Sequence, residues 1–364
     1  MALRQISFEY GMEFGFDEMT GALGDSITVL PIVVSLALLT PLSLAHTLVA
    51  FGVFQILWGV VYGIPLSVEP MKALAGLAIA GTISMGELVA AGLIAGVVLL
   101  VAGRLGIVGI IERAVGLPVV RGIQLAVGLL LLITGIELAV RRPIPALVAA
   151  GLVGVVALAG YRDAGTLIVL SLGGIVAAWT TGVPTPTLPE FTSFASGSPS
   201  FTRGALEGVA AQLAMTIGNA AVATALLCSD LFDRDVSADR LAESMGAMTL
   251  AAVPIGGLPM CHGSGGLAGK HAFGARTGGA NVILGVAYIG LALVAGVVVA
   301  FPMAMLGVLL CVVGVELARV ALRSDDQLLT IGVGVLGVLT NVGVAFLLGA
   351  LLDHGLRNTD MRRG

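Results

Sequence analysis

Residues 63–81 read GIPLSVEPMKALAGLAIAG, and residues 257–274 read GLPMCHGSGGLAGKHAFG. The apolar parts of these stretches, 67–81 and 259–271, are too short and too rich in glycine and proline to cross a bilayer alone, because a spanning helix needs about 20 mostly apolar residues. Both stretches open on a Gly-x-Pro group. These two broken apolar segments decide how the rest of the chain is interpreted.

The composition around them is that of a membrane protein. Of the 364 residues, 57% are hydrophobic and 11% are charged, and the mean hydropathy is +1.06. Soluble domains carry about a quarter charged residues, so this chain has too few polar side chains to cover a surface that faces water. Apolar stretches recur from Gly21 to about Leu352. We therefore expect roughly a dozen spans in contact with membrane lipid and almost no extramembrane domain.

Several classes of function are excluded by what the sequence lacks. It has no basic stripe, so nucleic acid is not an expected partner. Cys228, Cys261 and Cys311 are widely spaced and form neither a disulfide framework nor a zinc pattern, so we expect no metal and no cofactor. The first 20 residues carry four acidic side chains and no apolar run, and we do not expect a cleavable signal peptide there.

The chain divides near its middle at the polar connection 183–203. Residues 1–182 are predicted to form a first repeat and residues 204–353 a second. The stretches LLITGIELA (131–139) and LCVVGVELA (310–318) resemble each other and follow the two broken segments in the same order. The apolar segments are 21–40, 45–63, 67–81, 86–103, 118–140, 144–160, 165–182, 204–228, 241–256, 259–271, 279–300, 302–322, and 327–352 as one long or two short spans.

Seven segments in each half would invert the second copy relative to the first. Inverted repeats with short, interrupted segments in corresponding positions indicate the binding site of a secondary transporter. The sequence thus predicts an all-α polytopic membrane protein of two inverted seven-segment repeats, in which elements 3 and 10 are broken helices.

The basic residues favour one orientation across the membrane. With the N-terminus inside, Lys72 and Arg121 lie in or at the membrane, and Lys270 falls in an inside loop with most other basic residues. The outside loops hold only Arg141, Arg142 and Arg203. This bias follows the positive-inside rule. We expect a multi-pass protein of the cell membrane, inner or plasma, with cytoplasmic N- and C-termini.

Polar and ionisable side chains within apolar segments are costly, and they are the candidate site residues. A half-helix that starts inside the membrane directs unpaired backbone N–H groups and its positive dipole end at a ligand. Two such ends, with glycines that admit a close approach, would cradle an oxyanion, and Lys72 would add a full positive charge. The candidate substrate-binding residues are Asp25, Ser26, Ser67, Glu69, Lys72, Gln212, Asn219, Cys261, His262, Gly263, Ser264 and Gly265.

Structural interpretations of these residues stay open. Glu69 and Lys72 are three residues apart and could only neutralise each other on one helix face. Asp25 could cap a helix or form a structural pair, and His262 could be a hydrogen-bonded core histidine.

Two further charged residues have structural interpretations alone. Glu316, three residues before Arg319, is most simply one half of an interfacial ion pair. Arg121 could anchor lipid headgroups or a neighbouring loop, and it is assigned no role in the site.

The same segments resemble the molybdate transporter family of plants, algae and prokaryotes, whose members are relatives of the sulfate permeases. The Cys-His-Gly-x-Gly-Gly-Leu-Ala element together with the Pro-Met-Lys element is the most specific part of the resemblance. The resembling stretches are GALGDSITVLP (21–31), IPLSVEPMKALAGLA (64–78), LPVVRGIQLAVGL (117–129), LCSDLFDRD (227–235) and LPMCHGSGGLAGKHAFGARTGG (258–279).

The resemblance implies the fold of sulfate permeases and nucleobase symporters. In that fold a core domain, elements 1–4 and 8–11, carries substrate against a gate domain, elements 5–7 and 12–14. The implied partner is a tetrahedral oxyanion, molybdate or sulfate, and a homodimer is the expected assembly. The sequence departs from the family pattern at Glu69, where Gln is expected, and at Lys270-His271, where Gln-Tyr is expected.

Glu69 bears on the mechanism. An ionised carboxylate repels a dianion, so we expect Glu69 or Asp25 to be protonated when substrate binds, which would couple transport to protons. One alternative is a nucleobase or other organic-anion permease, which needs aromatic rings that only positions such as Phe51, Phe54 and Trp58 offer. An intramembrane enzyme is not expected, because the adjacent Cys261 and His262 make a poor nucleophile–base pair.

Overall fold

The computed structural model describes residues 11–161, 164–190 and 192–360, and the side chains of 112–115, 218–219 and 356–360 lie outside that description. Six helices in the described part are long and apolar enough to cross a membrane, so the chain is a multi-pass membrane protein. These helices are α1 (Phe16–Leu39), α2 (Leu44–Tyr62), α4 (Met85–Leu105), α6 (Leu117–Val140), α8 (Ala164–Thr181) and α14 (Met303–Ala321).

Shorter elements fill the space between the long helices. In the first half they are β1 (Glu69–Pro70), α3 (Lys72–Ile79), α5 (Val108–Val115) and α7 (Pro143–Leu158). In the second half they are α9 (Arg203–Met215), the π-helical turn η1 (Thr216–Ala221), α10 (Val222–Phe232), α11 (Ala238–Ala252), η2 (Val253–Ile255), β2 (Met260–Cys261), α12 (Ser264–Ala272), α13 (Gly279–Ala292), η3 (Ala295–Ala300), α15 (Gln327–Leu339) and α16 (Val342–Asp360).

Most element boundaries follow the sequence prediction, but several features differ from it, among them the predicted segment 279–300, which divides into α13 and η3. The segment 327–352 forms two helices, α15 and α16, with a break at residues 340–341. The segment 204–228 is interrupted by a π-helical turn, and α5 was not predicted. The start of α4 shows the local reason for a boundary: Ser84 Oγ accepts from the Glu87 amide at 3.2 Å while Glu87 Oε2 accepts from the Ser84 amide at 2.7 Å, which is a capping box.

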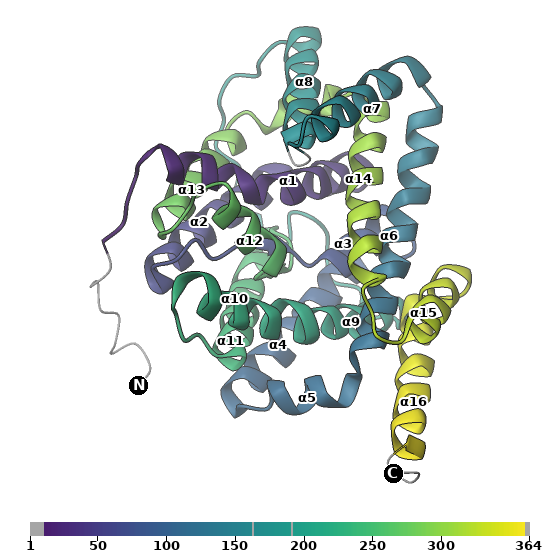
Figure 1. Cartoon of the computed structure of the whole chain (residues 1–364). Helices are drawn as coiled ribbons and strands as arrows, with labels where there is room; N and C mark the ends of the chain where they lie inside the picture. Colours follow the sequence, from purple (N-terminus) through teal and green to yellow (C-terminus); the bar gives the residue numbers. More distant parts are fainter. Residues whose placement is uncertain (1–10, 162–163, 191, 361–364) are drawn as a thin grey trace.

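The helix contacts obey a twofold exchange between the halves. Helix α2 packs on α13 as α11 packs on α4, and α1 packs on α12 as α9 packs on α3, while α6 and α14 pack on each other (Figure 1). The counterparts in the two halves are α1 and α9, α2 and α11, α3 and α12, α4 and α13, and α6 and α14. When each helix is replaced by its counterpart, the same set of contacts results. The arrangement is the inverted repeat that the sequence predicts.

Glycines allow the α6–α14 pair to pack backbone to backbone. A Cβ atom on Gly128 would lie 2.8 Å from the Gly314 carbonyl oxygen, and one on Gly135 would lie 2.6 Å from that of Gly307. Between helices in lipid, such close approach supplies van der Waals contact that a hydrophobic driving force cannot.

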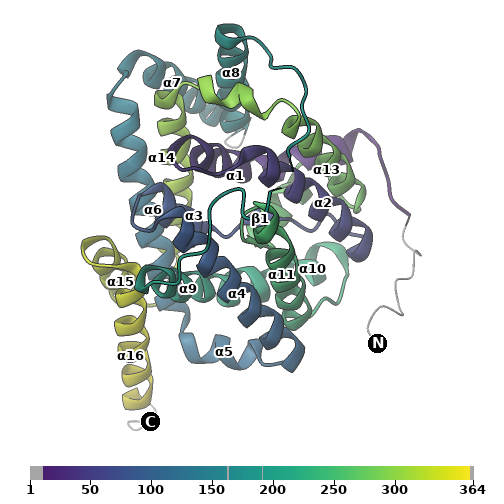
Figure 2. The same ribbon diagram turned by 180° about the vertical axis from the view of Figure 1, so that it is seen from behind.

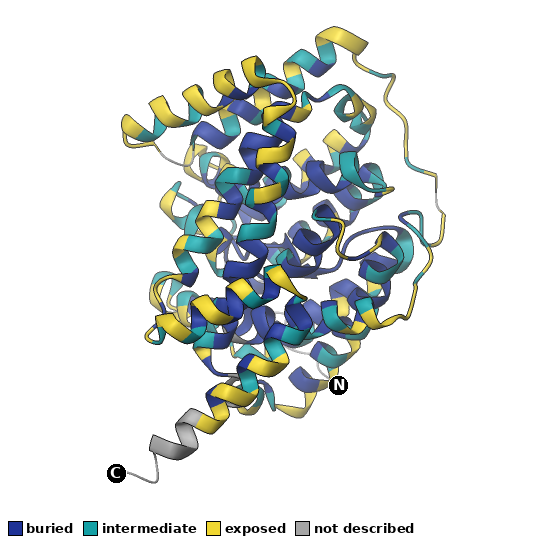
Figure 3. Ribbon diagram, turned by 90° about the vertical axis from the view of Figure 1, so that its right-hand side faces the viewer, coloured by how far each residue is buried: buried dark blue, intermediate teal, exposed yellow. Residues whose placement is uncertain are grey.

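The broken segments meet in the interior. Strands β1 and β2 pair antiparallel, with Glu69 opposite Cys261 and Pro70 opposite Met260, and β1 lies near the middle of the molecule in Figure 2. Buried residues gather around this centre, and exposed ones lie mainly along the outer faces of the peripheral helices (Figure 3). The exposed residues there include many large apolar side chains, as expected of surfaces that face lipid.

Candidate functional site

The two short helices start on either side of the β1–β2 pair. Helix α3 begins at Lys72, two residues after Pro70, and α12 begins at Ser264, three residues after Cys261. Each strand has only two residues and is followed closely by its helix, so the N-terminal ends of α3 and α12 lie at the two ends of one short strand pair. This is the juxtaposition that the sequence predicts from two half-helices.

A cavity of about 170 Å³ lies at this junction. It is smaller than the roughly 300–1,000 Å³ pockets that take drug-sized ligands, so it suits a small molecule or ion. Side chains from α1, α3, α9 and α12 face it from one side, and side chains from α6 and α14 face it from the other. The described lining residues are Thr28, Glu69, Lys72, Gln124, Gln212, Met215, Ala220, Cys261, Gly263, Ser264, Gly265, Val313, Glu316, Leu317 and Val320.

Glu69 and Lys72 form an ion pair at the cavity wall. Lys72 Nζ lies 2.6 Å from Glu69 Oε2, and Ser67 Oγ donates to Glu69 Oε1 at 3.2 Å. The Glu69 side chain is 1% exposed and that of Lys72 is 19% exposed, so the lysine is the more accessible partner. The two charges therefore neutralise each other, as one interpretation of the sequence expected, but not on one helix face, because Glu69 lies in β1 and Lys72 begins α3.

The Glu69 carboxylate also rests against the first turn of α12. A Cβ atom on Gly263 or Gly266 would collide with it, so only glycine admits the carboxylate at these positions. The negative charge thus lies at the positive end of a helix and beside a lysine ammonium. Both features stabilise an anion at this point.

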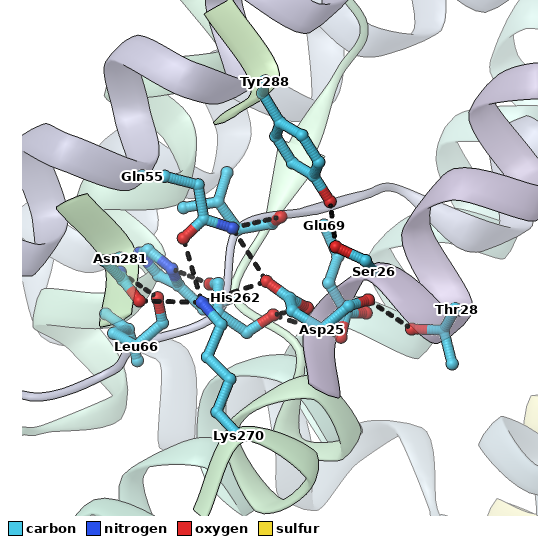
Figure 4. Close-up of polar contacts among 12 residues, drawn as sticks. Asp25, Ser26, Thr28, Gln55, Leu66, Glu69, His262, Lys270, Asn281 and Tyr288 are labelled. Carbon is cyan, nitrogen blue, oxygen red and sulfur yellow. Dashed lines mark hydrogen bonds and ion pairs between the residues drawn. The ribbon is translucent and has the colours of Figure 1, made fainter. Parts of the chain in front are cut away.

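Asp25 belongs to a second ion pair, with Lys270. Lys270 Nζ lies 3.1 Å from Asp25 Oδ2, and neither side chain is exposed (Figure 4). The assignment of Lys270 to an inside loop is therefore wrong: α12 turns it into the interior, where Asp25 compensates its charge. A buried lysine needs such a partner because an uncompensated charge is strongly destabilising there.

Neutral groups complete the surroundings of that pair. Lys270 Nζ donates to Gln55 Oε1 at 3.0 Å and to Asn281 Oδ1 at 2.7 Å. Asp25 accepts from Gln55 Nε2 at 2.7 Å and from Ser67 Oγ at 2.6 Å. Helices α1, α2, α12 and α13 are joined through this network, which favours the structural interpretation of Asp25.

Gln212 caps α3 from the neighbouring helix α9. Its Oε1 accepts from the backbone amides of Ala73 at 3.0 Å and Leu74 at 3.2 Å, and its Nε2 donates to Thr216 Oγ1 at 2.8 Å. These two amides of the first turn of α3 are therefore already paired within the protein. The sequence analysis expected both short helices to direct unpaired backbone N–H groups at a ligand. This expectation needs correction for α3, which offers the cavity its Lys72 side chain while Gln212 occupies two of its amides.

The His262 ring points away from the cavity. Its Nδ1 pairs with the Ser67 carbonyl at 2.9 Å and its Nε2 with Ser244 Oγ at 2.8 Å, and the ring packs edge-on against Trp58 and Tyr62. It is a hydrogen-bonded core histidine, as the structural interpretation had it.

The structure thus divides the candidate residues into two groups. Four of the candidates are not among the described residues that line the cavity: Asp25, Ser26, Ser67 and His262. Ser26 Oγ is instead hydrogen-bonded to Tyr288 Oη at 3.1 Å. The side chain of Asn219 lies outside the described part of the chain. The candidates that line the cavity are Glu69, Lys72, Gln212, Cys261, Gly263, Ser264 and Gly265.

Sequence reasoning missed the residues that α6 and α14 contribute. Gln124 and Glu316 line the cavity, and Glu316 is exposed whereas Glu69 is buried. The sequence did contain a reason to consider Glu316 as a site residue. It is a carboxylate within an apolar segment, and it lies in the stretch 310–318 that resembles 131–139. Its spacing from Arg319 suggested an interfacial pair instead.

Comparison with known proteins shows to which family the chain is similar. The family model "Molybdate transporter of MFS superfamily" matches residues 17–131 and 204–317. Molybdate transporter 1 of Arabidopsis thaliana is 31% identical and matches over 92% of this chain and 87% of its own length. Molybdate transporter 1 of Chlamydomonas reinhardtii is 29% identical over 92% of this chain and 90% of its own length.

Solved structures give the fold. The transmembrane domain of the cyanobacterial bicarbonate transporter BicA superposes with a TM-score of 0.67 over 94% of this chain and 100% of that domain, at 16% identity. The murine anion transporter Slc26a9 in its inward-facing state gives 0.71 over 97% of this chain and 70% of that one, at 13% identity. The expected inverted-repeat fold is confirmed. With the family model and the plant and algal relatives in agreement, the chain belongs to the molybdate transporter family.

Proposed function

We propose that this protein is a secondary transporter that imports a tetrahedral oxyanion, molybdate or sulfate, and holds it in the cavity between α3 and α12. The observation that carries the proposal is the accessible Lys72 ammonium beside the glycine-lined start of α12, in a cavity of about 170 Å³. A lysine charge and a helix N-terminus are both complementary to an oxyanion. The names of the plant and algal relatives support molybdate as the first choice of substrate.

Glu69 acts as an internal anion in this proposal. Its carboxylate holds Lys72 and covers the first turn of α12, which are the groups that an incoming oxyanion needs. Substrate must therefore replace Glu69 as the partner of Lys72. Protonation of Glu69 removes its charge, releases the lysine and removes a repulsion from the dianion, so transport is coupled to a proton.

The charge of the cavity lining supports a requirement for protons. Glu69 and Glu316 contribute two carboxylates and Lys72 one ammonium, which is a net negative lining when all three are ionised. A dianion is accommodated more easily after a proton has neutralised one carboxylate. Asp25, already paired with Lys270 in the interior, is the less suitable of the two proton carriers first considered.

Alternating access would arise from movement between two groups of helices. The core group, α1–α4 and α9–α13, supplies the residues around Lys72, and the gate group, α6–α8 and α14–α16, supplies Gln124 and Glu316. Sliding of the core against the gate would expose the cavity to one side and then the other. The proposed setting is the cell membrane with cytoplasmic termini, and a homodimer is the proposed assembly.

A nucleobase or organic-anion permease has less support. No aromatic ring is present among the described residues that line the cavity. Phe51 is fully buried and the Trp58 ring packs on His262. A planar base would therefore lack a stacking partner.

The test is binding and uptake by the purified, reconstituted protein. We expect the wild type to bind molybdate and to accumulate it in proteoliposomes when an inward proton gradient is imposed. Lys72→Ala should weaken binding by about tenfold or more, since a charged hydrogen bond contributes about 1.5–3 kcal/mol. Glu69→Gln should keep binding but lose most of the dependence of uptake on pH.

The exposed Arg142→Ala variant is the control for loss of one positive charge, and it should match the wild type. Oxyanion transport would be rejected if the wild type bound neither molybdate nor sulfate. Proton coupling alone would be rejected if Glu69→Gln kept the wild-type response to pH and to the gradient.

A further inference from the structure

Arg121 is a charged residue that the proposed mechanism does not use. It lies on α6, one turn before the cavity-lining Gln124, and its Nη1 donates to Gln124 Oε1 at 3.1 Å. Its Nε is buried and has no hydrogen-bond partner among the described residues. A buried guanidinium N–H without a hydrogen-bond partner destabilises the folded protein, so its presence here calls for a physical explanation.

The packing of α6 on α14 places Arg121 just beyond one end of the cavity lining. Gly135 lies against Gly307, and seven residues back along α6, Gly128 lies against Gly314. The helices are antiparallel, so two more turns bring Arg121 level with Ala321. This position is one residue beyond Val320, the last described lining residue of α14, in the direction of the exposed Arg323.

Among the described side chains, no negative charge forms an ion pair with Arg121. Arg323, an exposed residue just after α14, is close enough for its positive charge to interact with that of Arg121. Arg121, with its buried unpaired N–H, and the exposed Arg323 therefore place positive charge beyond the end of a cavity whose described lining is net negative.

We infer that Arg121 is an oxyanion-binding residue at the mouth of the cavity, which receives the anion before Lys72 holds it. This inference rests on the proposed function. The planar guanidinium offers two parallel N–H donors that match two oxygens of a tetrahedral oxyanion. Its pairing with Gln124 fixes the guanidinium beside the path from the mouth to Lys72.

A positive residue at the mouth has a distinctive kinetic effect. It raises the rate of anion association, and this gain declines as salt screens the charge. A residue that only supports the fold would change stability without this salt dependence. The association rate at two ionic strengths therefore separates the two roles.

The experiment measures molybdate association with the full chain in nanodiscs of uncharged phosphatidylcholine. We expect Arg121→Gln to slow association by roughly tenfold at low salt and to lose most of the wild-type salt dependence. Arg121→Lys should recover the salt dependence but bind less tightly than the wild type, because it keeps the charge and loses the two-donor geometry.

Two control variants sharpen the result. Arg142→Gln removes an exposed charge just beyond the other end of α6 and should leave association unchanged. Glu112→Gln tests a carboxylate whose side chain lies outside the described part of the chain. If it shifts stability and association as Arg121→Gln does, Arg121 is one half of a structural pair and the inference is wrong.

Three further results are decisive. Unchanged association in a folded Arg121→Gln protein overturns the inference. A defect that appears only when the nanodiscs contain anionic lipid also overturns it, because it assigns Arg121 to a phospholipid headgroup. A wild type that binds no oxyanion instead overturns the proposed function on which the inference rests.

Discussion

The two buried ion pairs have the same chemistry and different surroundings. Asp25–Lys270 is closed on all sides by Gln55, Ser67 and Asn281. Glu69–Lys72 lies at a cavity, and its lysine is partly exposed. Hydrogen-bonded closure favours a fixed structural role, whereas access to a cavity allows the partner to be exchanged for a ligand.

The closed pair makes a direct prediction about stability. Lys270→Met should lower the free energy of unfolding by about 3–5 kcal/mol, because it leaves the Asp25 carboxylate buried without its counter-ion. The measurement is the thermal unfolding of the purified protein in detergent. The double variant Asp25→Asn, Lys270→Met should recover part of the loss, and a single variant as stable as the wild type would contradict the role given to this pair.

Sequence reasoning at this scale found both acidic residues and Lys72, the partner of Glu69, but it did not find Lys270 as the partner of Asp25. Asp25, Glu69 and Lys72 were identified because ionisable groups are rare in apolar segments. Lys270 was assigned to an inside loop with most other basic residues, following the positive-inside rule. Only the position of α1 beside α12 brings its carboxylate partner to it.

At the scale of elements, the short helices α3 and α12 are not equivalent. Gln212 covers two amides at the start of α3, and the glycines of α12 leave room for the Glu69 carboxylate. The cap of α3 fixes that helix, while the anion beside α12 can exchange. This asymmetry arises because the two repeats carry different residues at equivalent positions, with Glu69 in one and Gly263 in the other.

The cap leads to a prediction that separates stability from binding. Gln212→Leu should lower the free energy of unfolding by about 0.5–2 kcal/mol, the usual effect of losing a cap, and should also weaken anion binding. Gln212→Glu keeps an acceptor for the two amides and adds a negative charge to the cavity. It should therefore keep its thermal stability and bind molybdate less tightly.

The measurements are unfolding temperature and molybdate affinity on the same preparations. Equal loss of stability in both variants would show that the Gln212 oxygen does not act as the cap. Undiminished affinity in Gln212→Glu would place this side chain away from the bound anion.

At the scale of the whole molecule, the cavity belongs to neither half alone. Its lining comes from α1, α3 and α6 of the first repeat and from α9, α12 and α14 of the second. Access to it depends on how the helices around Lys72 sit against α6 and α14. A probe inside the cavity therefore reports on that arrangement.

Cys261 is a natural probe of this kind. It lines the cavity, whereas Cys228 is fully buried in α10 and Cys311 lies beside α6. In a protein with Cys228→Ala and Cys311→Ala, a small thiol reagent should modify Cys261, and molybdate at ten times its Kd should slow the reaction by roughly tenfold through occupancy. Mass spectrometry of the modified protein gives the rate.

Chloride at the same ionic strength is the control and should give no protection. Protection by chloride equal to that by molybdate would indicate a general salt effect. Absence of protection by molybdate would place the anion outside the cavity.

The sequence by itself determined the membrane class, the two related halves and the two broken segments, because these depend on composition, length and local repetition. It also located Glu69, Lys72 and the glycines of α12, since a short interrupted segment is visible without knowing what packs on it. The contributions of Gln124 and Glu316 to the cavity, the pairing of Lys270 with Asp25 and the capping of α3 by Gln212 were decided only by the tertiary structure. Each of these joins residues far apart in the chain, and their contacts exist only once inverted packing has brought the two repeats together.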